Sequence, residues 1–287
     1  MIYNSASEWQ GAAHKRVALF GMSGLGKTYL SEMLRAGGAW FHYSVDYRIG
    51  TRYMGEHIVD NFKREAMRVP FLRELLMTDS IHIASNITFE NLSPLSTYLG
   101  KPGAPAKGGI NFDEYIARQR QHREAEQAAI TDTGLFVNKA LDIYGYEHFV
   151  CDTSGSICEV VDANNPDDPV LNALSAAALP VWIKGNADHK DELVARFDAA
   201  PKPMYYREGF LREKWAEYLA LKAVSAEAVD PNDFIRWGYG ELLDARLPRY
   251  EAIAQNWGIT VDADDVRHIR DPKDFNALIG QTLEARS

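Results

Sequence analysis

Cysteine is scarce in this 287-residue chain. The two cysteines, Cys151 and Cys158, are too few for a disulfide framework, and their spacing is not that of a CxxC metal or redox site. We therefore interpret both as half-buried, small apolar side chains. This cysteine usage fits a reducing compartment, and we expect a cytoplasmic protein.

Long hydrophobic runs and excess positive charge are also missing. No apolar run approaches the ~20 residues that span a bilayer, and the first residues lack the apolar core of a signal peptide. With 31 Lys and Arg against 40 Asp and Glu, the formal net charge is -9. This balance disfavours nucleic acid and anionic membranes, so we expect neither as a partner. The eight histidines are scattered without an H-x-x-x-H pair, so no zinc site is expected.

Short apolar runs alternate with helical patterns along the chain. We expect strands at 16–20, 39–45, 146–151, 180–183 and 257–261. We expect helices at 28–35, over most of 47–76, from Asn111 through Glu126, at 170–178 and at 188–197. Strands that alternate with helices predict a parallel sheet covered on both faces.

Three segments receive a more specific expectation. Residues 93–109, with several prolines and glycines, are expected to be a loop, and 80–87 a short strand or extended segment. The helix that carries Arg118 and Glu126 has charges of both signs. It is expected to be a salt-bridged surface helix or, alternatively, a basic lid.

The clearest motif lies between the first strand and the first helix. Residues 21–28, GMSGLGKT, match G-x-x-x-x-G-K-S/T without a departure. Glycines let the backbone turn its N–H groups toward phosphate oxygens, and the following helix adds the positive end of its dipole. We therefore expect nucleotide binding. The expected contacts are Gly21, Ser23, Gly24, Leu25, Gly26, Lys27 and Thr28.

The same motif predicts the cofactors. Lys27 is placed to reach the β- and γ-phosphates and the Thr28 hydroxyl to bind magnesium, so ATP and Mg²⁺ are expected. An Asn-Lys-x-Asp guanine-binding motif is absent, which disfavours a GTPase. Asp152 is followed by Thr153 rather than by a glutamate, which disfavours a AAA-type ATPase.

Two aspartates, Asp46 and Asp152, stand where predicted strands end. Ligands of open α/β sheets bind beyond those ends. One such carboxylate can hold Mg²⁺ and another can orient or deprotonate an attacking hydroxyl, although either could simply cap a helix. We expect Thr28 and Asp152 at the metal, Asp46 at the acceptor, and Lys27, Asp46 and Asp152 as the catalytic residues.

At this point the chain resembles the shikimate kinase family. Residues 44–49, SVDYRI, resemble its Asp-x-Asp-x-x-Ile motif: Asp46 matches the aspartate that contacts substrate, and Ser44 replaces the one that helps to hold magnesium. Residues 149–156 resemble the third strand and its Gly-Gly-Gly turn, of which Gly155 remains. The resemblance implies that Gly155 contacts substrate.

The resemblance continues in the second half of the chain. Residues 181–204 resemble the fourth strand, the lid and Arg-Pro-Leu, with Lys202 in place of the arginine that packs against the nucleotide. Residues 244–261 resemble the Arg-x-x-x-Tyr-x-x-x-Ala helix and last strand, and Arg246 matches an arginine that binds substrate. Independently of the family, the bidentate fork of Arg48 suits an anionic acceptor, or Arg48 is a solvated helix residue.

The matching segments leave two regions uncovered, at about 52–143 and 206–240. We expect one domain over 1–287, a three-layer α/β P-loop NTPase fold with those regions as helical insertions. The predicted function is ATP- and Mg²⁺-dependent transfer of a phosphoryl group to a hydroxyl of a small molecule. Two alternatives stay open: a regulatory or assembly ATPase that contacts a protein partner through the insertions, and a nucleoside or nucleotide kinase.

Overall fold

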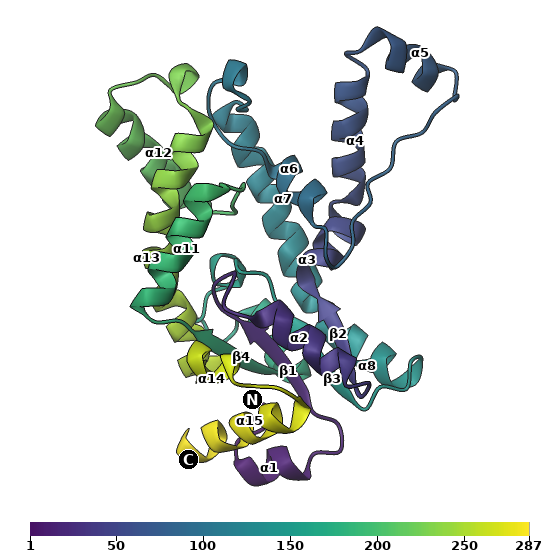
Figure 1. Ribbon diagram of the computed structural model, residues 1–287, viewed down its shortest axis with the longest axis vertical. Coiled ribbons are helices and arrows are strands. Elements are labelled where there is room, and N and C mark those ends of the chain that lie inside the picture. The colour runs from purple at the N-terminus through teal and green to yellow at the C-terminus, as the bar shows by residue number, and fades with distance from the viewer. Residues whose placement is uncertain (287) are drawn as a thin grey trace. The chain divides into compact units, whose positions relative to one another are not determined.

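The computed structural model describes residues 1–286, and its strands in this range form one parallel sheet (Figure 1). The sheet order is β2-β3-β1-β4-β5. The strands are β1 (Arg16–Phe20), β2 (Trp40–Ser44), β3 (His148–Asp152), β4 (Leu179–Lys184) and β5 (Ile259–Asp262). A five-stranded parallel sheet of this order, flanked by helices, is an α/β fold like that of P-loop NTPases, which confirms the predicted fold class.

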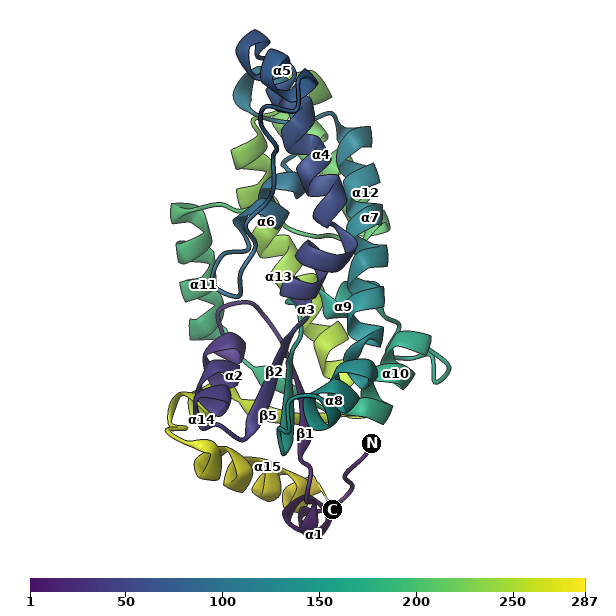
Figure 2. The ribbon, with the colours of Figure 1, turned by 90° about the vertical axis from the view of Figure 1, so that its right-hand side faces the viewer.

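Helices cover both faces of this sheet. α2 (Lys27–Ala36) packs on β2 and β3 from one side, and α8 (Thr133–Asp142) packs on the same strands from the other (Figure 2). α10 (Pro169–Ala177) contacts both α8 and β4. Because the central strands are covered twice, four of the five residues in β1 and in β3 are buried. Double burial is why these strands are continuous apolar runs.

The chain divides into two compact units. The first consists of residues 1–45 and 126–201 together with the chain from Arg236 onward, and it holds the whole sheet. The second consists of residues 46–125 and 202–235. Much of the second unit falls in the segments predicted as insertions, whereas α8 belongs to the first. The organisation as one domain with two insertions stays a prediction.

The first unit is completed by helices at both ends of the chain. Trp9 of α1 packs edge-on against Phe275 of α15 at 6.5 Å between ring centroids, and its indole N–H donates to the Asn276 carbonyl at 3.0 Å. These additional helices are α1 (Ala6–Gly11), α9 (Ile157–Val160), α11 (Ala187–Ala199), α14 (Ala263–Arg267) and α15 (Pro272–Arg286).

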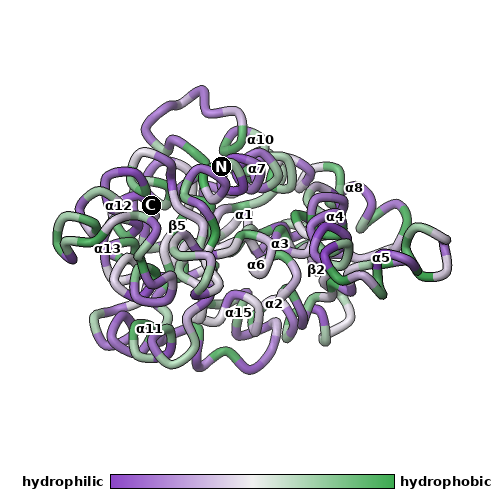
Figure 3. Tube along the Cα trace, turned by 90° about the horizontal axis from the view of Figure 1, so that it is seen from above, coloured by the Kyte–Doolittle hydropathy of each residue, from purple (hydrophilic) through white to green (hydrophobic). Residues whose placement is uncertain are grey.

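The second unit is helical in its described residues and has its own aromatic core. Trp215 stacks on Phe112 at 4.6 Å and meets Phe234 edge-on at 4.9 Å. The tube in the region of α4 is coloured mainly hydrophilic, with some hydrophobic segments (Figure 3). The elements are α3 (Val45–Arg48), the π-helix η1 (Ile49–Tyr53), α4 (Gly55–Ala66), α5 (Pro70–Met77), α6 (Ser93–Leu99), the 3₁₀ turns η2 (Pro105–Lys107) and η3 (Ala226–Ala228), and α12 (Glu208–Lys222). Two long helices, α7 (Phe112–Thr131) and α13 (Pro231–Trp257), have residues in both units.

Two predicted boundaries are wrong. Residues 93–109 are not a loop throughout, because α6 occupies their first part; Pro94 lies in its first turn, where a missing N–H breaks no helical hydrogen bond. Trp257 ends α13 and does not begin the last strand. A β-carbon on Gly258 would lie 2.2 Å from the Pro180 carbonyl oxygen, so only glycine allows the chain to pass β4 there.

Other expectations are confirmed. Asn111 precedes α7 and its side chain accepts a hydrogen bond from the Asp113 N–H at 2.8 Å. Residues 81–88 are neither helix nor strand, which leaves the extended interpretation. Cys151 and Cys158 are unbridged as expected, but both are fully buried and not half-buried, and burial raises the pKa of both thiols. Within residues 1–286, no helix combines the length and apolarity required to cross a membrane.

Candidate functional site

The loop between β1 and α2 is shaped by its glycines. Gly21, Gly24 and Gly26 have φ values of 135°, 91° and 96°, a region that side chains strain to adopt. At Gly21 a β-carbon would also lie 2.7 Å from the Ile183 carbonyl oxygen of β4. These positions of the motif therefore require glycine for a backbone reason.

Lys27 lies inside the turn that this loop makes. The side chain is buried, and its Nζ donates to the carbonyls of Gly21 at 2.9 Å and Met22 at 3.0 Å. Lys27 is also the first residue of α2, and the N-cap, Gly26, offers no side-chain cap to the first-turn N–H groups. A cation and helix N–H groups thus meet at one place, which is the arrangement that binds phosphate.

Thr28 and Asp152 connect the start of α2 to the end of β3. The Thr28 hydroxyl donates to Asp152 Oδ2 at 2.6 Å. Asp152 is nearly buried, and burial raises the pKa of its carboxyl, while Lys27 and Thr28 act in the opposite direction. In the strand register Asp152 pairs with Ser44, the residue that replaces a magnesium-site aspartate in the resemblance. Asp152 therefore brings a carboxylate to the strand next to the position where that aspartate is missing.

These two side chains fit a magnesium ion. A hydroxyl and a carboxylate oxygen are hard ligands of the kind that Mg²⁺ prefers, with water and substrate phosphates completing its shell. The raised pKa of Asp152 is the response expected of a buried carboxylate near only one ammonium group. Groups of three or more His, Cys, Asp or Glu suited to a metal are absent from the described residues, so the protein alone offers no closed metal cage.

A histidine lies behind this pair. His42 Nε2 of β2 is 4.0 Å from Asp152 Oδ2, and the ring is buried. Burial, with a smaller contribution from Arg35, lowers the pKa of His42 to about 4. The imidazole is therefore neutral at neutral pH and adds no positive charge beside Asp152.

Arg196 is a basic residue at this site to which sequence reasoning assigned no role. A β-carbon built on Gly24 would lie 3.1 Å from Arg196 Nη1 and 2.8 Å from Leu193 Cδ2, so α11 brings both side chains against the glycine loop. Among residues 1–286, no carboxylate lies within ion-pair distance of Arg196. The resemblance to a lid included this helix, but arginine is so frequent on helix surfaces that the sequence did not single it out.

The turn after β3 abuts the same loop. A β-carbon on Gly155 would lie 2.4 Å from Ser23 Oγ. On either side of Gly155, the hydroxyls of Ser154 and Ser156 donate to the carboxylate of Glu126, the second at 2.8 Å. Glu126 is completely buried, so the prediction of a surface ion pair is wrong for this residue. A glutamate on a charged helix gives no sequence signal of such a role, because its partners come from another part of the chain.

Arg246 holds the far side of this turn. Its Nε donates to Glu159 Oε1 at 3.1 Å and its Nη1 to the Gly155 carbonyl at 3.0 Å, and the side chain is buried. Arg249 also binds Glu159, and the Tyr250 hydroxyl donates to the Gly155 carbonyl. Arg246 thus makes structural contacts that the resemblance did not imply, while contact with substrate stays a prediction for both Arg246 and Gly155.

The structure therefore brings together the predicted residues of the first unit, Lys27, Thr28 and Asp152, at the carboxyl ends of β1 and β3. Three other predicted residues, Asp46, Arg48 and Lys202, belong to the second unit. Asp46 lies in the first turn of α3, and the Arg48 guanidinium lies 5.5 Å from the centroid of the Tyr53 ring. Lys202 is exposed in the irregular segment after α11. The roles of these three residues stay predictions.

Comparisons with known proteins identify no family. No protein-family model matches the chain, and no curated protein does. Among solved structures, a crystal structure of shikimate kinase from Bacteroides thetaiotaomicron is similar at 13% identity and a TM-score of 0.39, over 94% of this chain and 98% of that chain. The assignment of the fold accordingly follows from the sheet order and the loop geometry of the chain itself.

Proposed function

We propose that this protein is an ATP- and Mg²⁺-dependent phosphotransferase that transfers the γ-phosphoryl group to a hydroxyl of a small molecule. The observation that carries the proposal is the buried Lys27 ammonium, enclosed by a glycine loop and next to the Thr28–Asp152 pair. Lys27 Nζ donates hydrogen bonds to two carbonyls of this loop. A triphosphate would supply the negative charge that such a buried cation favours.

In this proposal, residues of the first unit bind the nucleotide and its magnesium ion. The loop N–H groups and Lys27 bind the phosphates, with Lys27 exchanging its carbonyl partners for phosphate oxygens. Thr28 and Asp152 would hold Mg²⁺, which when bound neutralises charge on the phosphates. Arg196, beside Gly24, approaches the phosphates from α11 and stabilises the charge that develops during transfer.

The acceptor side of the proposal rests on the sequence. Asp46, two residues after the end of β2, orients the acceptor hydroxyl and takes its proton. The hydroxyl oxygen forms a bond to the γ-phosphorus as the bond to the β–γ bridging oxygen breaks, and ADP leaves with that electron pair. Arg48, Gly155 and Arg246 are proposed to contact the acceptor. Lys202 is proposed to pack against the nucleotide.

One contact favours transfer to an acceptor over simple hydrolysis. The residue after Asp152 is Thr153, and its hydroxyl donates to the Leu19 carbonyl at 2.9 Å. AAA-type ATPases usually have a glutamate at this position to activate water. A threonine engaged with the neighbouring strand cannot perform that role.

The test is ADP release with Mg²⁺-ATP in the presence of a library of small hydroxylated compounds, with ³¹P NMR to identify the product. We expect one acceptor class to stimulate turnover, and Lys27→Ala to lower the stimulated rate by about 10³-fold. Lys273→Ala, an exposed lysine on α15, is the matched control and should keep the wild-type rate. Undiminished turnover in Lys27→Ala would overturn the proposal.

The same assay separates the alternatives. Stimulation by a macromolecule alone would indicate a regulatory ATPase, and stimulation by nucleosides or nucleotides would indicate a nucleoside or nucleotide kinase. Asp46→Asn tests the acceptor side. It should abolish transfer to the identified acceptor while calorimetry records unchanged affinity for Mg²⁺-ATP.

A further inference from the structure

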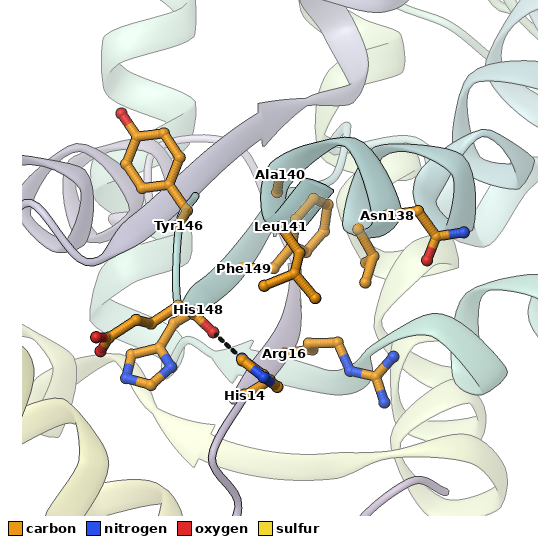
Figure 4. A pocket seen from close by; sticks show the side chains of 10 residues that line it. His14, Arg16, Asn138, Ala140, Leu141, Tyr146, His148 and Phe149 are labelled. Carbon is orange, nitrogen blue, oxygen red and sulfur yellow. Dashed lines mark hydrogen bonds between the residues drawn. The ribbon is translucent and has the colours of Figure 1, made fainter. Parts of the chain in front are cut away.

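A cavity of about 240 Å³ lies in the first unit, away from the glycine loop (Figure 4). It opens at the amino ends of β1 and β3, where Arg16 of β1 pairs in register with Phe149 of β3. Gly21 and Asp152 lie at the opposite ends of these two strands. A ligand bound in this cavity would therefore occupy a site separate from the one proposed for the nucleotide.

The walls of the cavity are mainly apolar and aromatic. Phe149 lies at the back of the view in Figure 4, with Leu141 of α8 in front of it and Tyr146 to one side. Leu141 is 46% exposed, so apolar surface at the mouth remains in contact with water. A planar apolar ligand would remove that surface from solvent.

One cation of the cavity has no counter-ion. Nε of Arg16 is buried without a hydrogen-bond partner, and no carboxylate of residues 1–286 lies within ion-pair distance of its guanidinium. Asn138 of α8 lines the same cavity, and in Figure 4 its amide lies on the same side of the view as the Arg16 guanidinium. Because Arg16 is only partly buried and has no acidic partner in the described residues, its guanidinium can donate to an acceptor that enters the cavity from outside the protein.

The neighbouring groups leave Arg16 as the main source of positive charge. The His14 ring is held by donating from Nδ1 to the Glu147 carbonyl at 3.0 Å. His148 accepts the Lys15 N–H at Nδ1, and burial and Lys15 lower the pKa of His148, so this ring is neutral. Glu147 is the one carboxylate among the residues that line the cavity, and its side chain is exposed to water, which screens its charge.

We propose that this cavity binds a small aromatic carboxylate. The aromatic ring would cover the exposed side chain of Leu141, and the carboxylate would accept hydrogen bonds from Arg16 and from the Asn138 amide. Inorganic phosphate would leave the apolar walls exposed. A neutral aromatic compound would leave Arg16 without an acceptor. A ligand with one aromatic ring and one carboxylate would both cover the apolar wall and give Arg16 an acceptor.

In the test, benzoate is added to the full chain as the probe, and NMR titration of the backbone amides measures its binding. Benzyl alcohol is the matched probe that has the ring but no charge. Inorganic phosphate is the probe that has negative charge but no apolar group. Benzoate should bind saturably, with shifts confined to the start of β1, β3 and α8. Arg16→Gln should weaken benzoate binding by about tenfold or more without weakening benzyl alcohol.

Two further variants keep the outcome decisive. Asn138→Asp changes an exposed residue, so the protein should stay folded, and its negative charge should weaken benzoate binding even if Arg16→Gln does not fold. Lys27→Ala should bind benzoate as the wild type does, which separates this site from the nucleotide site. Equal affinity for benzoate and benzyl alcohol, tighter binding of phosphate, or benzoate binding unchanged in Asn138→Asp would overturn the proposal.

Discussion

Polar groups are partnered differently at the two ends of the strands in the first unit. We call the carboxyl ends of the strands the carboxyl edge of the sheet and their amino ends the amino edge. At the carboxyl edge, Lys27 binds its own loop and Thr28 binds Asp152. At the amino edge, Nε of Arg16 is buried without a partner beside apolar walls. β1 joins the two edges, with Arg16 at one end and the glycine loop after the other.

The difference shows how one parallel sheet supports two kinds of recognition. The groups at the carboxyl edge are already held in place by hydrogen bonds within the loop and between side chains. A ligand that replaced these hydrogen bonds would therefore cause little further loss of conformational entropy. The amino edge instead offers a cavity in which an incoming ligand would supply the missing acceptor. The carboxyl edge should therefore be sensitive to changes in charge and loop geometry that leave the amino edge unaffected.

The largest expected effect is that of Asp152→Asn. Loss of the carboxylate should lower phosphoryl transfer by about 10³-fold, because the amide cannot neutralise a bound cation. In the absence of ligand the same variant should melt at a higher temperature. Burial raises the pKa of Asp152, so the folded protein disfavours the charged form, and at neutral pH the charge lowers stability.

Calorimetry measures thermal unfolding and the ADP-release assay measures turnover, so the two experiments check both outcomes. Asp142→Asn, at the exposed end of α8 and close to the amino edge, is the matched control and should change neither quantity. A lower melting temperature in Asp152→Asn would show that the contacts with Lys27 and Thr28 outweigh burial.

The next effect concerns acid stability and compares two histidines. The pKa of His42 falls from 6.5 to about 4 on folding, so the folded state binds a proton less readily than the unfolded state. Stability is therefore lost as the pH falls from about 6.5 to about 4, by about 3 kcal/mol from this group. His42→Gln should reduce that slope in urea unfolding measured across this pH range.

His148, at the amino edge, supplies the comparison. Burial also lowers its pKa, but the ring is only half-buried, so His148→Gln should flatten the pH dependence less than His42→Gln. Equal slopes in the wild type and His42→Gln would contradict the assignment of this acid sensitivity to His42.

The smallest effect of the series is that of Gly155→Ala. The added β-carbon would meet Ser23 Oγ at 2.4 Å and displace the glycine loop from the turn after β3. Affinity for Mg²⁺-ATP, measured by calorimetry, should fall by about tenfold. Ser23→Ala in the same protein should restore part of it, because the clashing oxygen is removed.

Gly11→Ala serves as the control for this variant, since a β-carbon at Gly11 meets nothing within 4 Å. Nucleotide affinity should be unchanged in that protein. If Gly155→Ala also leaves the affinity unchanged, the turn after β3 does not hold the loop in its binding shape.

Local patterns predicted a large part of the fold. The limits of β1, the long helix after Asn111 and the alternation of strands and helices follow from apolar periodicity and capping, which act between neighbours in the chain. The failures at 93–109 and at Trp257 arose where a proline suited a helix start and where Gly258 passed a neighbouring strand.

The sequence by itself determined the glycine loop, because its backbone angles demand glycine and its lysine and threonine follow at fixed spacing. It also singled out Asp152, since strand ends are readable from the sequence. Only the tertiary structure decided that Glu126 is buried against Ser154 and Ser156, that Arg196 lies against Gly24, and that Arg16 lines a cavity. Those facts depend on contacts between distant segments, and the burial of a charged side chain is set by what folds over it, not by its neighbours in the chain.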